Sequence, residues 1–124
     1  MATKAIRLTV TTSGPPGGAT GTAHAGLDWG KLLGLEVIPS EGCPETINTY
    51  VDCTLPSLKR LLTLEDWNYP MPLFAYTELQ RDTSGQERAS PATAYPLLVG
   101  GLLVVTVTDA DPGNEVTVVA VVEV

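Results

Sequence analysis

Few side chains in this sequence could do chemistry, and they lie far apart. His24 is the only histidine, surrounded by Ala and Thr, with Asp28 as the nearest acid. A hydrolytic triad needs a base held beside a nucleophile and oriented by a third group. No nucleophile motif accompanies His24 and no second base is available. We therefore interpret His24 as a surface or packed strand residue and predict no catalytic residues and no enzyme activity.

The two cysteines, Cys43 and Cys53, are predicted to lie in a loop and in a strand. Disulfides are disfavoured in the cytoplasm, where we expect the chain to be made, so we interpret them as two unrelated thiols. A disulfide that closes the intervening loop is the alternative. Two cysteines and one histidine cannot supply the four ligands of a zinc site. No metal and no cofactor are predicted.

Two acidic segments and one glycine-rich segment have alternative explanations. The acidic residues after the penultimate strand have the composition of a calcium loop, but their spacing differs from the twelve-residue pattern and a proline interrupts them. These residues are Asp109, Asp111, Asn114 and Glu115. The carboxylate pairs Glu65-Asp66 and Asp109/Asp111 could flank a glycosidic bond, although any acidic chain contains such pairs. The segment Gly14-Pro15-Pro16-Gly17-Gly18 lacks the Gly-Lys-Ser/Thr of a phosphate-binding loop and is predicted to be a turn.

Four aromatic residues gather in the middle of the sequence: Trp67, Tyr69, Phe74 and Tyr76. They could form a platform for a sugar ring. Such clusters are more often a small satellite core or the anchor of a protein interface. Both interpretations stay open, and the first gives an alternative function, a carbohydrate-binding module that uses Trp67, Tyr69 and Tyr76.

Composition limits the class of protein. The chain has 124 residues, of which 44% are hydrophobic, enough for one folded domain over residues 1–124. Seven basic and fourteen acidic residues give a net charge of −7, which disfavours nucleic acid and anionic membranes as partners. No apolar run approaches the roughly 20 residues that span a bilayer. The first residues lack the apolar core of a secretory signal, so we expect synthesis in a cytoplasm.

Short runs rich in β-branched residues alternate with turn-forming residues every ~8–12 positions. This pattern predicts an all-β, antiparallel β-sandwich (jelly-roll-like) of about eight or nine strands. In residues 31–38 we expect Leu33, Leu35 and Val37 to point inward. Residues 58–62 could form a helix capped by Ser57, but a strand over 60–64 is favoured, and residues 80–92 are predicted to be an exposed loop. The predicted strands span residues 6–11, 19–25, 31–38, 46–54, 60–64, 73–77, 101–108 and 115–124.

The last 24 residues form the clearest hairpin, with a turn over 109–114. The returning strand is apolar on both faces, because Val119 and Val121 alternate with a second row of valines. Such a strand lies in the middle of a sheet with both faces covered, or a second subunit covers one face. Since 124 residues leave little material for a third layer, a partner subunit is favoured.

The order of these patterns resembles a group of small virion proteins of tailed phages. The similarity lies first in the opening strands (residues 8–12 and 18–23) and in residues 30–37 before 46–51. It continues in the Leu/Thr strand 61–64 before Tyr69-Pro70, and in residues 96–107 followed by Asp109-Ala110-Asp111 and the valine-rich strand ending in Glu123.

The resemblance implies a single β-sandwich that decorates or extends the particle, with no enzymatic residues. The favoured function is a capsid decoration or cement protein that binds and stabilises the assembled head. Its partners would be the major capsid protein or other virion proteins, and copies of itself, with a homotrimer favoured at three-fold lattice positions. Its location would be the virion, after synthesis in the host cytoplasm. A tail or neck structural protein is the alternative within this class.

Overall fold

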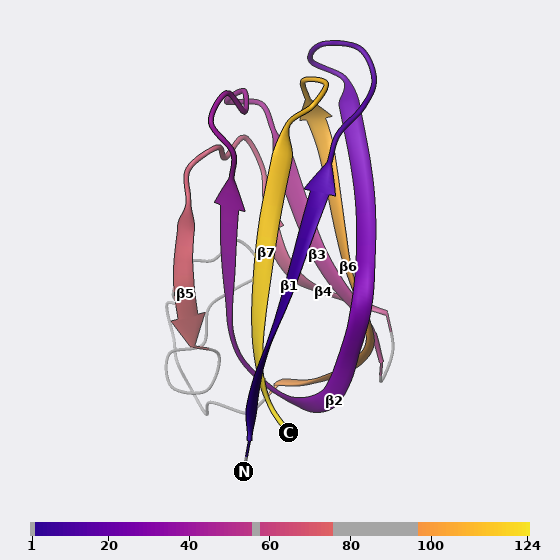
Figure 1. The fold of residues 1–124 in the computed structure, drawn as a ribbon, viewed down its shortest axis with the longest axis vertical. Coiled ribbons are helices and arrows are strands. Elements are labelled where there is room, and N and C mark those ends of the chain that lie inside the picture. The colour runs from indigo at the N-terminus through magenta and orange to yellow at the C-terminus, as the bar shows by residue number, and fades with distance from the viewer. Residues whose placement is uncertain (1, 56–57, 76–96) are drawn as a thin grey trace.

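The computed structural model describes residues 2–55, 58–75 and 97–124. Seven β-strands and no helix occur in this part of the chain (Figure 1). The all-β class is confirmed, whereas about eight or nine strands were predicted for the whole chain. All strand pairs are antiparallel. The strands are β1 (Thr3–Thr11), β2 (Ala19–Pro39), β3 (Asn48–Leu55), β4 (Lys59–Leu64), β5 (Met71–Ala75), β6 (Leu97–Ala110) and β7 (Glu115–Glu123).

The strands form one hydrogen-bonded sheet in the order β1-β7-β2-β6-β3-β4, and β5 pairs with β2 beside this path. The favoured strand over 60–64 is confirmed as β4, and the helix alternative there is wrong. The predicted strand over 73–77 begins earlier, as β5, and its last two residues lie outside the described residues, as does the predicted loop over 80–92.

The long strand β2 pairs with different strands along its length, and so connects the part of the sheet that contains β6 with the part that contains β7. Its first half pairs with β6, from Ala19 to Leu32, and its second half pairs with β7, from Lys31 to Pro39. We predicted two strands, 19–25 and 31–38, with a break between them, but the chain continues as one curved strand through this segment (Figure 1). Gly30 allows the close approach of β7 within this strand, since a Cβ there would overlap the carbonyl oxygen of Glu123.

An irregularity in the pairing of β2 with β7 changes which leucine is buried. The register shifts between Leu32 and Gly34, so that Leu32 is fully buried and Leu33 is half-buried. The prediction that Leu33 points inward is wrong for this reason. Leu35 and Val37 are fully buried, as predicted.

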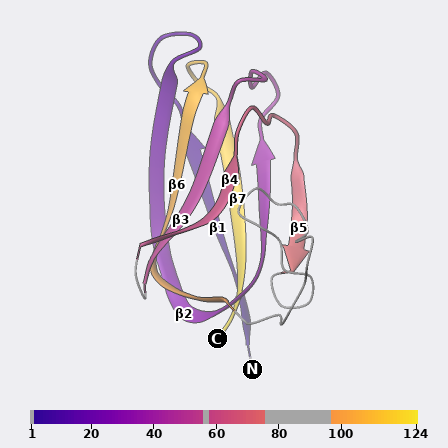
Figure 2. The ribbon, with the colours of Figure 1, turned by 180° about the vertical axis from the view of Figure 1, so that it is seen from behind.

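The core is largely aliphatic and takes buried side chains from all seven strands. In Figure 1, β1 and β7 lie in front of β3, β4 and β6, and Figure 2 shows the reverse view. Strand β3 alternates regularly, because Thr49, Val51 and Cys53 are buried while their neighbours are partly exposed. The largest fully buried side chains are Leu32, Leu35, Ile47, Leu61, Leu62 and Leu103.

Strand β7 is central, because it pairs with β1 on one side and with β2 on the other. One face is fully buried, and the other, with Val119 and Val121, is half-buried. Arg7 and Glu36 lie opposite Val119 on the two neighbouring strands. The half-buried face of β7 therefore lies in a surface where charged residues of β1 and β2 neighbour the valines. The central position of β7 in the sheet accounts for most of the valine content of the strand.

The two ends of the molecule differ. The connections β1–β2, β2–β3, β4–β5 and β6–β7 all lie at one end, which we call the loop end (Figures 1 and 2). The curve of β2, the start of β6, the end of β3 and both chain termini lie at the opposite end. No helix of the described residues is long and apolar enough to cross a membrane.

Candidate functional site

The residues that could have supported catalysis are not brought together. His24 is exposed on β2, opposite Val104 of β6, and Asp28 forms an ion pair with Lys4 instead. Within residues 2–55, 58–75 and 97–124, no three His, Cys, Asp or Glu side chains converge as a metal site would require. The interpretation of His24 as an ordinary strand residue is confirmed.

The two cysteines are buried thiols with no disulfide between them. Cys43 lies in the β2–β3 loop, where its Sγ is 3.6 Å from Ser40 Oγ and 3.8 Å from the carbonyl oxygen of Glu115. Cys53 lies in β3 and its Sγ donates to the carbonyl oxygen of Leu55 at 3.4 Å. The interpretation as two unrelated thiols, one in a loop and one in a strand, is confirmed.

The acidic segment after β6 is a turn. The Asn114 amide N–H donates to the carbonyl oxygen of Asp111 at 3.3 Å, and Gly113 has φ +80° after Pro112, the arrangement of a type II turn. The Asp111 carboxylate accepts from the Gly17 amide at 2.9 Å, and the Asp109 carboxylate accepts from the Asn48 side chain at 2.7 Å. These carboxylates therefore stabilise the local backbone at this end of the molecule. The segment Gly14-Pro15-Pro16-Gly17-Gly18, which contains the Gly17 amide, is confirmed as a turn.

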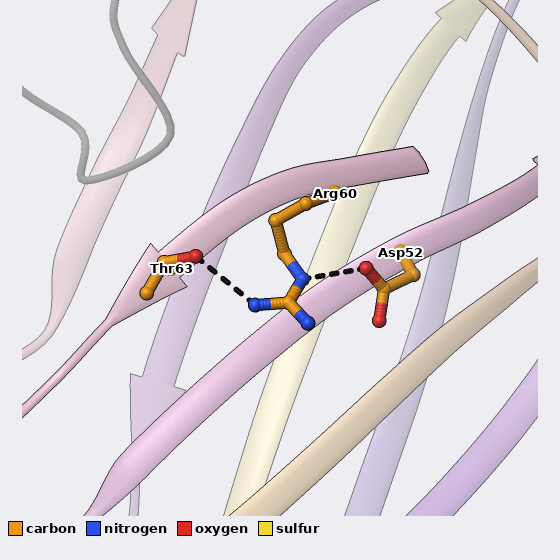
Figure 3. Close-up of polar contacts among 3 residues, drawn as sticks. All are labelled: Asp52, Arg60 and Thr63. Atoms are coloured by element: carbon orange, nitrogen blue, oxygen red, sulfur yellow. Dashed lines mark hydrogen bonds and ion pairs between the residues drawn. The ribbon is translucent and has the colours of Figure 1, made fainter. Parts of the chain in front are cut away.

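A polar cluster lies on the outer face of β3 and β4 (Figure 3). Arg60 Nε donates to Asp52 at 2.6 Å, Arg60 Nη1 donates to Thr63 Oγ1 at 3.2 Å, and the guanidinium lies 4.6 Å from the centre of the Tyr50 ring. Each charged side chain thus has its partner already. Such exposed pairs stabilise proteins little, about 0–1 kcal/mol each, and we assign this cluster no binding role.

An apolar patch lies at the end opposite the loops. We define it by Trp29, Leu55 and Leu102, which are 54%, 48% and 40% exposed and lie on the adjacent strands β2, β3 and β6. Leu58, just before β4, is 75% exposed. Most large apolar side chains with this exposure in the described residues therefore gather near one place.

Two glycines leave room for the side chains of the patch. A Cβ on Gly100 would lie 2.5 Å from Trp29 Cε3, so the indole ring covers the backbone of Gly100. Gly101 has φ +75°, and a Cβ there would overlap Thr54 Oγ1 and approach Leu55. Thr54 Oγ1 in turn accepts from the Leu102 amide at 2.9 Å. The pairing is irregular on both sides of β6 beside the patch, between Leu27 and Gly30 of β2 and between Cys53 and Leu55 of β3.

A second candidate site is a cleft at the loop end, with a volume of about 480 Å³. We call it the loop cleft. It lies between the β2–β3 and β4–β5 connections and is lined by one aromatic and four polar residues, namely Glu45, Thr46, Asp66, Asn68 and Tyr69.

The predicted aromatic cluster is brought together only in part. Trp67 packs against the core, and its ring meets the Tyr69 ring edge-on, with centroids 6.1 Å apart. Phe74 lies in β5, opposite Leu35, while Tyr76 lies outside the described residues. Of the predicted pair Glu65-Asp66, only Asp66 lines the loop cleft.

Sequence reasoning missed the apolar patch altogether, and missed Glu45, Thr46 and Asn68 of the cleft. The adjacent glycines 100 and 101 inside a strand-forming run were the available signal, since such glycines mark close approach of another group. Comparison of the chain with models of protein families, with curated proteins and with solved structures gave no match.

Proposed function

We propose that this protein is a non-enzymatic structural protein of a tailed-phage virion, which binds the assembled head as a decoration or cement protein. The observation that carries the proposal is the apolar patch of Trp29, Leu55 and Leu102. Exposed apolar groups that gather in one place mark protein interfaces, and tryptophan is the residue most enriched among those that dominate binding energy.

The packing of the patch supports the same function. Trp29 lies against Gly100 and Leu55 against Gly101, and side chains that already rest on the backbone lose less freedom on docking. A binder repeated over a shell stabilises that shell by mass action, without any reaction. Its partner would be the major capsid protein.

For the architecture, we propose that the two parts of the sheet, joined through β2, form a jelly-roll-like β-sandwich. The pairing of β2 with β6 in one half and with β7 in the other supports this. We also propose a homotrimer at three-fold positions of the head. Sedimentation-equilibrium measurement of the mass of the protein tests the trimer.

Co-sedimentation with phage heads tests the proposed attachment. The heads are assembled from the major capsid protein encoded in the same genome. A Trp29→Ser, Leu102→Ser double variant should bind at least about tenfold more weakly than the parent, because both side chains would lose apolar contact area in the complex. Its thermal unfolding should change little, since both side chains are already exposed.

Val121→Ser is the matched comparison, because it removes a half-buried apolar side chain from the outer face of β7. This variant should co-sediment like the parent. If Val121→Ser loses binding and the double variant keeps it, the interface lies on β7 instead. Failure of the parent protein to bind any head would refute the proposed function.

A further inference from the structure

The β2–β3 and β4–β5 connections, which line the loop cleft, lie at one end of the molecule (Figures 1 and 2). The curve of β2, the start of β6 and the end of β3, which carry the apolar patch, lie at the opposite end. A protein attached through the patch would present this cleft to the solvent. The residues and contacts that form the cleft do not depend on attachment of the protein to a phage head. Its volume of about 480 Å³ is within the range of small-molecule sites, roughly 300–1,000 Å³.

Hydrogen bonds fix both walls of the cleft. The Trp67 amide donates to the carbonyl oxygen of Ile47 at 3.1 Å, and Asn68 Nδ2 donates to the carbonyl oxygen of Cys43 at 3.0 Å. The Asp66 amide donates to Asn48 Oδ1 at 3.0 Å, which holds Asp66 at φ +52°. The two loops are therefore tied to each other, and the site exists before any ligand arrives.

The cleft presents one aromatic ring to solvent. Tyr69 is 65% exposed, and its ring stands at 83° to the ring of Trp67. Trp67 Nε1 also donates to the carbonyl oxygen of Tyr69 at 2.8 Å, which fixes the backbone below the ring. A ring that contacts a neighbouring ring edge-on and is largely exposed to solvent suits a flat ligand with an apolar face.

Oxygen acceptors surround this ring. Within the described part of the chain, neither the Glu45 nor the Asp66 carboxylate takes part in an ion pair or accepts a hydrogen bond. Asn68 uses its amide nitrogen toward Cys43, so its Oδ1 can accept from a ligand. A ligand that satisfies the cleft must therefore donate several hydrogen bonds, as hydroxyl groups do.

Charge narrows the class of ligand. Residues 40–47 and 65–70 contain Glu41, Glu45, Glu65 and Asp66 but neither Lys nor Arg, so anionic sugars and phosphates are repelled. A quaternary ammonium ion, which donates no N–H hydrogen bond, is held best by a cage of several aromatic rings, whereas Tyr69 is the single aromatic residue among those that line the cleft. We propose that the loop cleft binds a neutral saccharide, with a sugar ring on Tyr69 and its hydroxyl groups donating to Glu45, Asp66 and Asn68.

Nuclear magnetic resonance titration of the ¹⁵N-labelled protein tests this proposal. The probes are maltotriose, chitotriose, mannotriose and lactose. At least one should give saturable shifts confined to residues 40–48 and 65–70. Tyr69→Ala should weaken that binding about tenfold, by loss of the ring contact. Asp66→Asn should weaken it less, because asparagine tolerates the same backbone conformation and keeps one acceptor.

Tyr50→Ala is the matched aromatic control, since its ring lies on the outer face of β3, and it should bind like the parent. Asp28→Asn is the corresponding carboxylate control. Lack of binding by all four probes, or unchanged binding in Tyr69→Ala, overturns the proposal. Tighter binding of tetramethylammonium than of any saccharide would show a cation site instead, and tighter binding of 3′-sialyllactose than of lactose would refute the selection for neutral sugars.

Discussion

Gly101 is the residue where the fold depends most directly on the absence of a side chain. Its φ of +75° favours glycine, and the space that a Cβ would need is already occupied by Thr54 Oγ1 and Leu55. Gly113 has nearly the same φ, +80°, but nothing lies within 4 Å of a Cβ there. Alanine substitutions at Gly101 and Gly113 therefore separate the cost of backbone strain from the cost of steric overlap.

Gly101→Ala should lower the free energy of unfolding by about 3 kcal/mol, because strain and overlap add. Gly113→Ala should lower it by about 1 kcal/mol, from strain alone. Urea unfolding followed by fluorescence of the tryptophans measures both. Equal losses in the two variants would mean that the contact with Thr54 relaxes without cost.

At the scale of the elements, the sequence predicted the pattern of β3 well and that of β2 poorly. The strand predicted over 46–54 is present as β3, and its regular alternation buries Thr49, Val51 and Cys53 on one face. A bulge changes that alternation without any mark in the pattern of apolar residues, which is why Leu33 was placed inside in error. A break between the strands 19–25 and 31–38 was predicted, although Gly30 serves close packing within one continuous strand.

The two neighbouring leucines of β2 test this irregularity. Leu32→Ala should lower the free energy of unfolding by about 2–5 kcal/mol, because it opens a cavity among fully buried side chains. Leu33→Ala should cost about 1 kcal/mol or less, since that side chain is half-buried. Chemical unfolding compares them directly, and a larger loss in Leu33→Ala would place the bulge elsewhere.

At the scale of the whole molecule, the two candidate sites depend on contacts that periodicity does not encode. Trp29, Leu55 and Leu102 are far apart in sequence and become neighbours only through the register of β2, β6 and β3. The loop cleft likewise joins two connections that the chain visits 20 residues apart. All-β class, antiparallel pairing and most strand positions followed from local pattern, whereas both sites required the topology.

Hydrogen exchange should report this topology. Amides of β6 and β7 should exchange slowest, because each strand is paired on both sides. Amides of β5 should exchange much sooner, since this strand pairs only with β2 and over few positions. Mass spectrometry of peptides from partly exchanged protein measures the difference. Equal protection of β5 and β7 would contradict the central role of the hairpin.

The position of β7 also affects how the protein is made. This strand, the last in the sequence, lies between β1, the first, and the second half of β2. During synthesis, β1 and β2 leave the ribosome before β7, the strand that lies between them. Their apolar faces therefore stay uncovered until residues 115–123 have left the exit tunnel. The sheet is therefore expected to be completed only after residues 115–123 have left the exit tunnel. Nascent chains stalled before residue 115 would be degraded rapidly by proteases or held by chaperones.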